Sequence, residues 1–416
     1  MTPPLRPIIR NVSLVLICVG IVWIYIARVV RVYLAQRSAS SSQIEGAEHA
    51  IRLAPGNAEF HELLGLQLSA SDQDYDRAAT SLRNAVALNP NRARYWLDLA
   101  SVYQVTDNIE KQNDAVKSAL GAEPNDPEVA AEAGLFFLVA GDANRALPLF
   151  HLALAQNPDA ATSILPACWR EMRDASLILA KVIPDNPELQ LQFLALLTQQ
   201  KEPAAAQQVW QYLMASHRPF QPQLSFFYFD YLLNNRDVAG FAKDWRELAG
   251  VTPNLQAYLP NDNLMVNGSF EQPLLNSGFD WRREAINHIS AGIDASVAHS
   301  GTHSLSLSYD GNSAYDAGWK QFVPVKPNSE YEFSVWIKSE NVTSSSGPRV
   351  AIADAYSGTN LALTDDVLDT HPWQEMKTTL HVPANTELIA VKIVRTPAEP
   401  RIQGQVWIDD LRLVKR

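Results

Sequence analysis

The sequence has few of the residues that mark disulfide-stabilised, metal-binding or nucleic-acid-binding proteins. Cys18 and Cys168 are the only cysteines in 416 residues, which excludes a disulfide framework and a thiolate metal site. Acidic residues outnumber basic ones, 45 to 34, and no basic stripe occurs after residue 44, which argues against a nucleic-acid partner. Motifs for a nucleophilic serine, a zinc protease, a redox dithiol or a phosphate-binding loop are missing, and the nine histidines are dispersed.

The first 44 residues contain five arginines and no acidic residue. Val12–Ala27 is uncharged, and the arginines lie on both sides of it (Arg6 and Arg10 before, Arg28, Arg31 and Arg37 after). Because the apolar pattern continues to Leu34, the segment reaches the ~20 residues of a spanning helix. We predict an N-terminal tail over 1–10 and a transmembrane anchor helix over 11–34. A cleaved signal peptide is the alternative, but the apolar stretch is long and no A-x-A site follows it.

A repeat of about 34 residues follows the predicted anchor. Pro55, Pro90, Pro124 and Pro158 lie in similar contexts, separated by 35, 34 and 34 residues. Between them, small and large apolar residues recur at fixed offsets, as in Gly134-x-x-Phe137 and Ala146-x-x-x-Phe150. This pattern resembles the tetratricopeptide repeat. The resemblance implies antiparallel helix pairs, brought close together by small residues such as Gly65 and stacked into a superhelix.

We predict this helical array over residues 38–250, as five to six helix pairs of which the later ones are divergent, followed by a linker over 251–261. The aromatic residues Trp96, Tyr103, Phe137 and Phe150 are expected in its core, as is the aromatic run over 226–231. Arrays of this kind usually bind a protein partner in a groove. No residue of the array identifies that partner.

Beyond about Pro253 the composition changes to alternating apolar and polar residues with Gly, Asn and Ser turns. Strands are predicted over 304–309, 331–337, 350–352, 388–394 and 405–414, at spacings typical of a sandwich. The predicted fold is therefore multidomain: a transmembrane helix, an all-α tetratricopeptide superhelix and, over 262–416, an all-β antiparallel sandwich.

Sequence landmarks in this last region occur in a characteristic order. They are the opening Asn263–Glu271 (NLMVNGSFE), the turn His299–Leu307 (HSGTHSLSL), the strand centred on Tyr331 and the closing Trp407–Leu411 (WIDDL). The ordered set resembles the CenC-like carbohydrate-binding modules, which are jelly rolls of the galactose-binding-like group. The resemblance covers residues 262–416.

The resemblance implies a structural calcium ion, because many members of the family hold one between their first and last strands. Its ligands here would be Glu271, the region 299–301 and Asp409 or Asp410. Carboxylate and carbonyl oxygens from distant segments are the ligands that calcium prefers. A pair of solvated acids at a strand end is the alternative.

Sugar binding requires an aromatic ring presented flat to the sugar, with polar groups reaching its hydroxyls. Trp336 and Trp373 fall where the family packs its core, so we assign them to structure. The remaining candidates are Trp281, Tyr315, Trp319 and Tyr356, with Gln321 and Arg395 as polar partners.

These features together predict a non-catalytic, membrane-tethered scaffold. The array would hold a protein partner and the sandwich a polysaccharide, for example in bacterial envelope or exopolysaccharide assembly. The expected location is the bacterial inner membrane with residues 35–416 in the periplasm, although both flanks of the anchor are basic and do not fix its orientation. The alternative is a purely protein-binding scaffold with the sandwich as a structural or protein-binding domain. A third hypothesis is a glycosidase that acts through a carboxylate pair such as Glu271 with Asp409.

Overall fold

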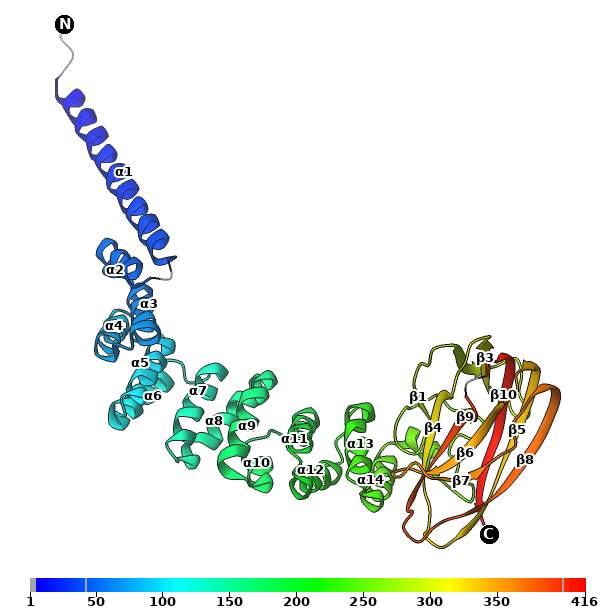
Figure 1. The fold of residues 1–416 in the computed structure, drawn as a ribbon. Helices are drawn as coiled ribbons and strands as arrows, with labels where there is room; N and C mark the ends of the chain where they lie inside the picture. Colours follow the sequence, from blue (N-terminus) through cyan, green and yellow to red (C-terminus); the bar gives the residue numbers. More distant parts are fainter. Residues whose placement is uncertain (1–4, 42, 399) are drawn as a thin grey trace. The chain divides into compact units, whose positions relative to one another are not determined.

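The computed structural model of the chain describes residues 5–41, 43–398 and 400–416 (Figure 1). The chain divides into two compact units, Met1–Gln190 and Leu191–Arg416. The boundary between the units falls inside helix α11 (Pro187–Gln199), within the helical array, and not at the predicted linker 251–261.

The first unit begins with the long helix α1 (Leu5–Ala39). Its segment Leu14–Ala39 is long and apolar enough to cross a membrane, with a mean hydropathy of 2.2. The large apolar side chains of this segment, from Leu14 to Leu34, are exposed, so they contribute nothing to the core of the unit. Residues 5–10, predicted as part of a tail, belong to this helix, while residues 1–4 lie outside the described residues.

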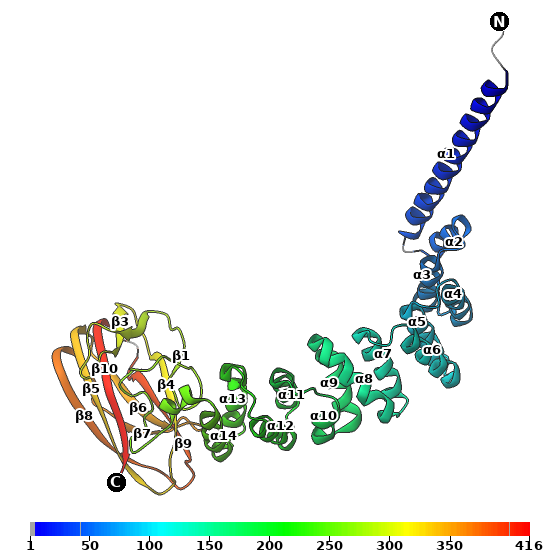
Figure 2. The same ribbon diagram turned by 180° about the vertical axis from the view of Figure 1, so that it is seen from behind.

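Shorter helices follow α1 and form pairs in the order of the chain (Figures 1 and 2). In the first unit they are α2 (Ile44–Leu53), α3 (Ala58–Gln67), α4 (Tyr75–Leu88), α5 (Ala93–Val105), α6 (Ile109–Ala122), α7 (Pro127–Val139), α8 (Ala143–Gln156), α9 (Ala161–Met172) and α10 (Ala175–Lys181). Each of the four repeated prolines comes two residues after the end of a helix, as its lack of an N–H group predicts.

The small residues of the repeat allow the two helices of a pair to approach closely. A Cβ atom added at Gly65 would lie 2.6 Å from Leu82 Cγ, and one added at Gly134 would lie 2.6 Å from the Phe150 ring. Tyr103, Phe137 and Phe150 are buried as predicted. Trp96 is only half-buried, and its indole N–H donates to the Pro90 carbonyl.

The turns between paired helices also repeat. Asp74, Asn108 and Asp142, spaced 34 residues apart, cap the second helices α4, α6 and α8, and each side chain accepts from the backbone N–H three residues on. The 35-residue interval from Pro55 to Pro90 has a local cause. A π-helical turn, Leu68–Asp72, extends α3 and accommodates one additional residue.

The second unit holds most of α11, then α12 (Pro203–Ala215), α13 (Phe226–Asn234) and α14 (Val238–Val251), with 3-10 turns at Pro222–Ser225 and Pro253–Tyr258. Together with the first unit, the described helices give six pairs, α3/α4 to α13/α14, in agreement with the prediction. In the aromatic run, Tyr228 and Phe229 are buried and stack on or around Trp210.

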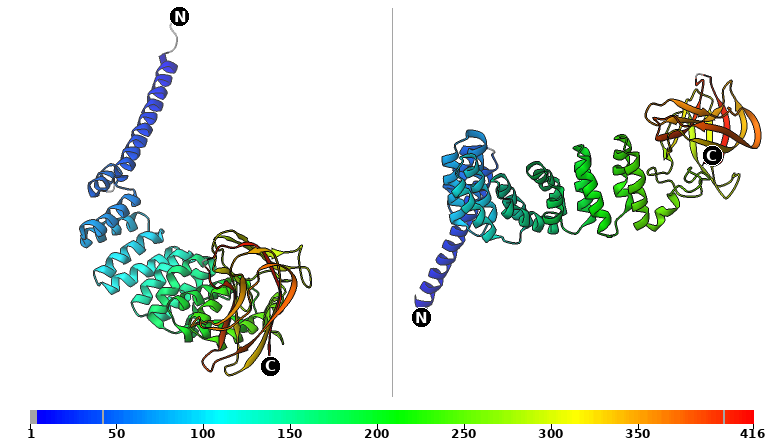
Figure 3. Two further views of the ribbon diagram at one scale, coloured as in Figure 1. Left: turned by 45° about the vertical axis from the view of Figure 1, so that its right-hand side comes forward. Right: turned by 90° about the horizontal axis from the view of Figure 1, so that it is seen from below.

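Two five-stranded antiparallel sheets complete the second unit, and they lie face to face (Figure 3). In spatial order, one sheet contains β1 (Arg282–Arg283), β4 (Asp316–Pro324), β9 (Leu388–Arg395), β6 (Pro348–Asp354) and β7 (Asn360–Leu363). The other contains β2 (Ile289–Asp294), β3 (Ser304–Asp310), β10 (Gln403–Lys415), β5 (Glu330–Thr343) and β8 (Asp369–His381). All five predicted strands are confirmed, and the inward residues of both sheets form one hydrophobic core.

The last helix pair packs directly against the sandwich. The Phe279 ring lies edge-on to Phe241 and Trp245 of α14, at centroid distances of 5.0 and 6.3 Å. Arg282 forms an ion pair with Asp230 of α13 at 2.9 Å. The segment predicted as a linker is structured, since the Trp245 indole N–H donates to the Tyr258 carbonyl.

Candidate functional site

The outer face of the β10–β5–β8 portion of the second sheet carries aromatic and charged side chains. In β5, Phe333, Val335 and Ile337 point into the core, so the alternate residues point outward. Trp336 is one of them, and it is half-exposed. The strand register places Asp409 of β10 on one side of Trp336 and Glu375 of β8 on the other.

Three rings gather at this point of the sheet. The His299 imidazole stacks on the Trp336 indole at a centroid distance of 3.9 Å and an interplanar angle of 14°. Trp373, half-exposed on β8, lies edge-on to the same imidazole at 5.6 Å. The loop that carries His299 therefore covers part of the sheet and adds a third ring to the two indoles.

A groove of about 510 Å³ lies beside the Trp336 ring. Its lining is mixed in charge and comes from β5, β8, β10 and the C-terminus: Glu332, Ser334, Trp336, Glu375, Lys377, Asp410, Arg412, Val414, Lys415 and Arg416. Asp410 turns toward the groove at an irregularity in β10, where its backbone φ is 49°. An apolar ring face bordered by hydrogen-bonding groups of both signs fits a polyhydroxylated ring better than a purely apolar ligand.

Carboxylates from both ends of the domain hold the loop His299–His303. We call these three residues, Glu271, Asp409 and Asp410, the carboxylate clamp. Glu271 Oε1 accepts from the N–H groups of Thr302 and His303, at 2.7 and 2.9 Å. Its Oε2 accepts from Thr302 Oγ1 and lies 3.1 Å from His303 Nδ1. The contact with His303, together with the Thr302 N–H, lowers the pKa of Glu271 to about 2.

Asp409 and Asp410 hold the other half of the same loop. Asp409 is buried, and its Oδ2 accepts from the N–H groups of His299 and Ser300 at 2.8 and 3.2 Å. Asp410 Oδ2 lies 2.6 Å from His299 Nδ1, which orients the imidazole over Trp336. Burial raises the pKa of Asp409, although the three backbone N–H groups that it accepts oppose this effect.

These contacts do not favour a calcium cage. All four hydrogen bonds at Glu271 and all three at Asp409 come from N–H, O–H or imidazole groups, and these groups occupy the lone pairs that a cation would need. Among the described residues, no three His, Cys, Asp or Glu side chains come together as metal ligands. The calcium ion implied by the resemblance stays a prediction, and the clamp is complete without it.

The sandwich matches a known family. Residues 262–398 match the family model described as carbohydrate binding domain. A search of curated proteins finds no match to the chain.

Solved structures resemble separate parts of the chain. One titled "CBM4 structure and function" is 16% identical, with a TM-score of 0.29, covering 36% of this chain and 99% of the other. The CBM22-1 xylan-binding domain from Paenibacillus barcinonensis Xyn10C is 16% identical, with a TM-score of 0.25, covering 36% and 91%. The MamA protein is 19% identical, with a TM-score of 0.29, covering 34% and 81%.

The structure corrects four of the six predicted sugar-binding residues. Trp281 and Trp319 lie inside the sandwich core with no exposed surface, where they contact Phe270 and each other. Gln321 is buried and bonds the backbone N–H and carbonyl of Val266. Arg395 is buried as well, and donates to the carbonyls of Ala314, Ser346 and Pro400. No sugar can reach these four side chains, because other parts of the domain surround them.

The remaining two candidates lie apart from the groove. The Tyr356 hydroxyl donates to the Leu233 carbonyl of α13 at 3.0 Å, and the Arg236 guanidinium lies over its ring at 5.0 Å. Tyr356 thus belongs to the contact between helices and sandwich. Tyr315 is 58% exposed and does not line the groove. The structure brings none of the six predicted residues together with Trp336.

The prediction assigned Trp336 and Trp373 to the core, and this is wrong for both. The alternation of the strand Tyr331–Ile337 contains the signal that was missed. Tyr331, Phe333, Val335 and Ile337 share one face, so Trp336 must share the other with Glu332 and Ser334. The signal for Trp373 is its spacing of two residues from Glu375, another outward residue of β8.

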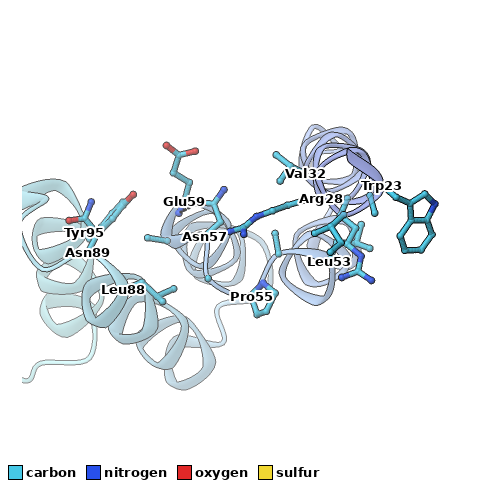
Figure 4. Close-up of a pocket in the computed structure, with 16 residues that line it drawn as sticks. Trp23, Arg28, Val32, Leu53, Pro55, Asn57, Glu59, Leu88, Asn89 and Tyr95 are labelled. Atoms are coloured by element: carbon cyan, nitrogen blue, oxygen red, sulfur yellow. Dashed lines mark hydrogen bonds between the residues drawn. The ribbon is translucent and has the colours of Figure 1, made fainter. Parts of the chain in front are cut away.

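A second hollow, of about 850 Å³, lies in the first unit beside α1 (Figure 4). Figure 4 shows Arg28 of α1 extending toward the start of α3, where Asn57 and Glu59 lie. Trp23 and Ile24 of the apolar segment also line this hollow. A site partly walled by the apolar segment is less suited to a soluble ligand than the groove on the sandwich.

Proposed function

We propose that the chain is a non-catalytic scaffold whose sandwich binds a glycan and whose helical array holds a protein partner. The proposal of glycan binding rests on the half-exposed Trp336 ring beside a charged groove, in a domain that matches the carbohydrate binding domain family. The repeated helix pairs support the proposal of a protein partner, since stacked repeats present an extended face to partners.

In this proposal the groove binds a sugar ring against indole faces. Trp336, against which the His299 imidazole stacks, offers a rigid aromatic surface whose position is fixed before binding. Glu375 and Lys377 on β8, with Arg412 on β10, lie where they can hydrogen-bond hydroxyl groups at the ring edge.

The buried position of Asp409 counts against the glycosidase hypothesis. A hydrolytic pair needs both carboxyl groups open to the scissile bond. Asp409 has no exposed surface and accepts three backbone N–H groups, while the hydrogen bonds of Glu271 all go to the loop 299–303. The proposed role of the sandwich is therefore binding alone.

The decisive experiment titrates the full-length chain with a panel of polysaccharides and follows tryptophan fluorescence. Trp336→Ala should weaken binding at least tenfold, because it removes the stacking surface. Trp373→Ala, which leaves the His299–Trp336 stack intact, should weaken binding less. Tyr315→Ala is the matched control, since it removes an exposed aromatic ring outside the groove. Unchanged affinity in both tryptophan variants would rule out this groove as the binding site.

The proposed location of the scaffold is supported by α1. We propose that Leu14–Ala39 anchors the chain in a bacterial inner membrane, with residues 35–416 in the periplasm and a role in envelope or exopolysaccharide assembly. Carbonate extraction should leave the chain in the membrane fraction, and protease added to spheroplasts should remove the sandwich. Protection from that protease would contradict the periplasmic location.

The packing of α13 and α14 on the sandwich favours one alternative, a purely protein-binding scaffold in which the sandwich caps the array. A cap of this kind would need no ligand. Failure of every polysaccharide to bind, with the array still binding its partner, would select this alternative.

A further inference from the structure

The hollow of about 850 Å³ beside α1, which we call the α1 hollow, combines apolar and polar surface. Figure 4 shows Trp23 of α1 at one end of it and Asn89 and Tyr95 at the other. Trp23 and its neighbour Ile24, which also lines the hollow, are 71% and 65% exposed. The volume lies in the range of ligand pockets, roughly 300–1,000 Å³. A ligand that fills the hollow must therefore have both an apolar and a polar part.

The lining of the α1 hollow is positively charged, although the whole chain has a net charge of −11. Arg28 and Arg31 are three residues apart, so they lie on one face of α1. Both side chains are exposed, and neither has a hydrogen bond or an ion pair in the part of the chain that the structure describes. Glu59 is the one carboxylate among the described lining residues. Two cations against one carboxylate favour a ligand that carries negative charge.

Asn57 adds a neutral donor to the two arginines. Its Oδ1 accepts from the Glu59 backbone N–H at 3.0 Å, which fixes the orientation of the carboxamide. The amide Nδ2 of the same side chain donates to no group among the described residues. Arg28 extends toward this side chain across the hollow (Figure 4). The three side chains thus offer guanidinium and amide N–H groups to one ligand, and such groups favour phosphate oxygens.

The depth of the α1 hollow relative to a membrane follows from the length of α1. A helix of 35 residues is about 52 Å long, whereas the hydrocarbon layer is only about 30 Å thick. Near the end of the helix, Ala35 is completely buried and packs in a small core with Ala50 of α2 and Phe60 of α3. Arg28 and Arg31 precede that core by one to two turns. In the anchored chain they lie where α1 passes from lipid to protein, in the headgroup layer.

General attraction between basic residues and a membrane surface would explain only the two arginines. It requires no hollow and no second wall. In this structure the wall opposite α1 comes from the end of α2, the start of α3 and the end of α4, and it includes the apolar residues Leu53 and Leu88. Leu88 is 44% exposed although it is large and apolar. A bound molecule with an apolar part would cover this surface.

We propose that the α1 hollow binds one molecule of an anionic phospholipid, with its phosphate group at Arg28 and Arg31 and an acyl chain along Trp23. Asn57 donates to the same phosphate group. This inference rests on the proposed membrane anchoring and adds a specific lipid ligand to it. The cations select the phosphate, and the continuity of the hollow with the apolar segment of α1 selects a lipid over a free phosphate ion.

The test measures lipid binding to the full-length chain in detergent micelles by native mass spectrometry. Phosphatidylglycerol and phosphatidylcholine are added separately at equal concentrations. Phosphatidylglycerol should bind as a single molecule with an affinity at least fivefold higher than that of phosphatidylcholine, whose quaternary ammonium group the arginines repel. Arg28→Gln with Arg31→Gln should abolish this difference. Excess glycerol 3-phosphate should not displace the lipid, because it has no acyl chain.

A matched double variant separates the hollow from the general charge of this region. Arg37→Gln with Arg52→Gln removes the same charge from exposed sites on α1 and α2 that do not line the hollow. Its affinity for phosphatidylglycerol should change less than twofold. Equal losses in the two double variants would overturn the proposal, because they would indicate attraction to net charge alone.

A second pair of variants fills the hollow without changing its charge. A Cβ atom added at Gly56, in the lining, or at Gly121, an exposed site of α6 outside it, meets no other atom within 4 Å. Gly56→Phe should weaken phosphatidylglycerol binding at least threefold, and Gly121→Phe should leave it unchanged. Equal affinities of the two glycine variants would place the lipid outside the hollow and contradict the proposal.

Two further results with the parent chain would also overturn the proposal. One is equal affinity for phosphatidylglycerol and phosphatidylcholine, and the other is displacement of the lipid by glycerol 3-phosphate, which would indicate a site for soluble phosphates. Carbonate extraction tests the anchoring independently. A chain that stays in the extracted membrane and binds no phosphatidylglycerol would therefore refute the lipid site and leave the anchor standing.

Discussion

At the scale of single residues, Glu62 shows how burial and a like charge act on one carboxyl group. Its folded-state pKa of about 7 lies above the ordinary value of 4.5 because the side chain is half-buried beside Asp98. A raised carboxyl pKa means that the folded state binds the proton more tightly than the unfolded chain does. Glu62 therefore contributes stability below pH 4.5, and this contribution is lost as the pH rises through about 7.

Glu62→Gln should remove this dependence on pH. The glutamine is neutral at every pH, so the variant should melt about 2–4 °C higher than the parent chain at pH 8, allowing for the solvent-exposed part of the side chain. At pH 4.5 the two melting temperatures should agree. Thermal unfolding of the array followed by circular dichroism at both pH values checks this. An equal difference at both would show that the effect comes from packing and not from titration.

Trp336 and Trp281 show where residue-level prediction was limited. The outward position of Trp336 was predictable from the alternation of inward and outward residues along its strand, because its neighbours at two-residue spacing are polar. The burial of Trp281 was not predictable, because Trp281 precedes the two-residue strand β1, which is too short for an alternating pattern, and contacts with distant segments bury the indole. A tryptophan next to so short a strand is thus assigned reliably only from its tertiary contacts.

At the scale of elements, the loop 299–303 depends on the carboxylate clamp. Three backbone N–H groups of the loop donate to Glu271 and Asp409 at distances below 3 Å, so these carboxylates hold both ends of the loop. The resemblance to known modules correctly indicated that these residues meet, although they lie far apart in the sequence. It did not indicate that imidazole and amide groups would be the partners of the carboxylates.

Asp409→Asn should destabilise the sandwich by about 1–3 kcal/mol, because one amide N–H group would face a backbone N–H group without an acceptor. The calcium ion expected from the sequence predicts that a chelator lowers the melting temperature of the parent chain. Differential scanning calorimetry measures both effects, with Asp365→Asn, an exposed acid of the same domain, as the control. A melting temperature that the chelator leaves unchanged would contradict the calcium ion and agree with a clamp held by hydrogen bonds alone.

The helical elements were the most predictable part of the chain, since their signal is local and repeated. Proline, small residues and large residues recur at fixed offsets, and each recurrence corresponds to one helix pair. The caps Asp74, Asn108 and Asp142 carry the same 34-residue period and would have strengthened the prediction. The π-helical turn Leu68–Asp72 marks where one additional residue is absorbed.

At the scale of the whole molecule, the last helix pair and the sandwich form one unit. Phe279 is buried between Phe241 and Trp245, and Gly278, with a φ of 60°, lies so close to the Trp245 indole that a Cβ atom would collide with it. The hydrogen bond from Tyr356 to Leu233 joins residues 123 positions apart. No periodic pattern in the sequence specifies such contacts, which explains why a linker was predicted here.

Phe279→Ala should therefore destabilise α14 and the sandwich together. Removing a buried phenylalanine costs about 3–5 kcal/mol, and both sides of the contact lose packing. Hydrogen exchange should become faster in α14 as well as in the sandwich strands. Phe150→Ala, at an equally buried site of the first unit, is the control and should leave exchange in α14 unchanged. Faster exchange confined to the sandwich would show that the two parts unfold separately.

The Phe279 contact also affects how the domains of such a protein could have been joined by gene fusion and where the chain can be divided. A sandwich excised at residue 262 would expose Phe279 and lose the partners of Arg282 and Tyr356, and the remaining helices would expose Trp245. The smallest segment that can be transferred with these contacts intact is therefore longer than the region that resembles the family. Gene fusions that graft this domain onto another protein should begin near residue 222, so that α13 and α14 are inherited with it.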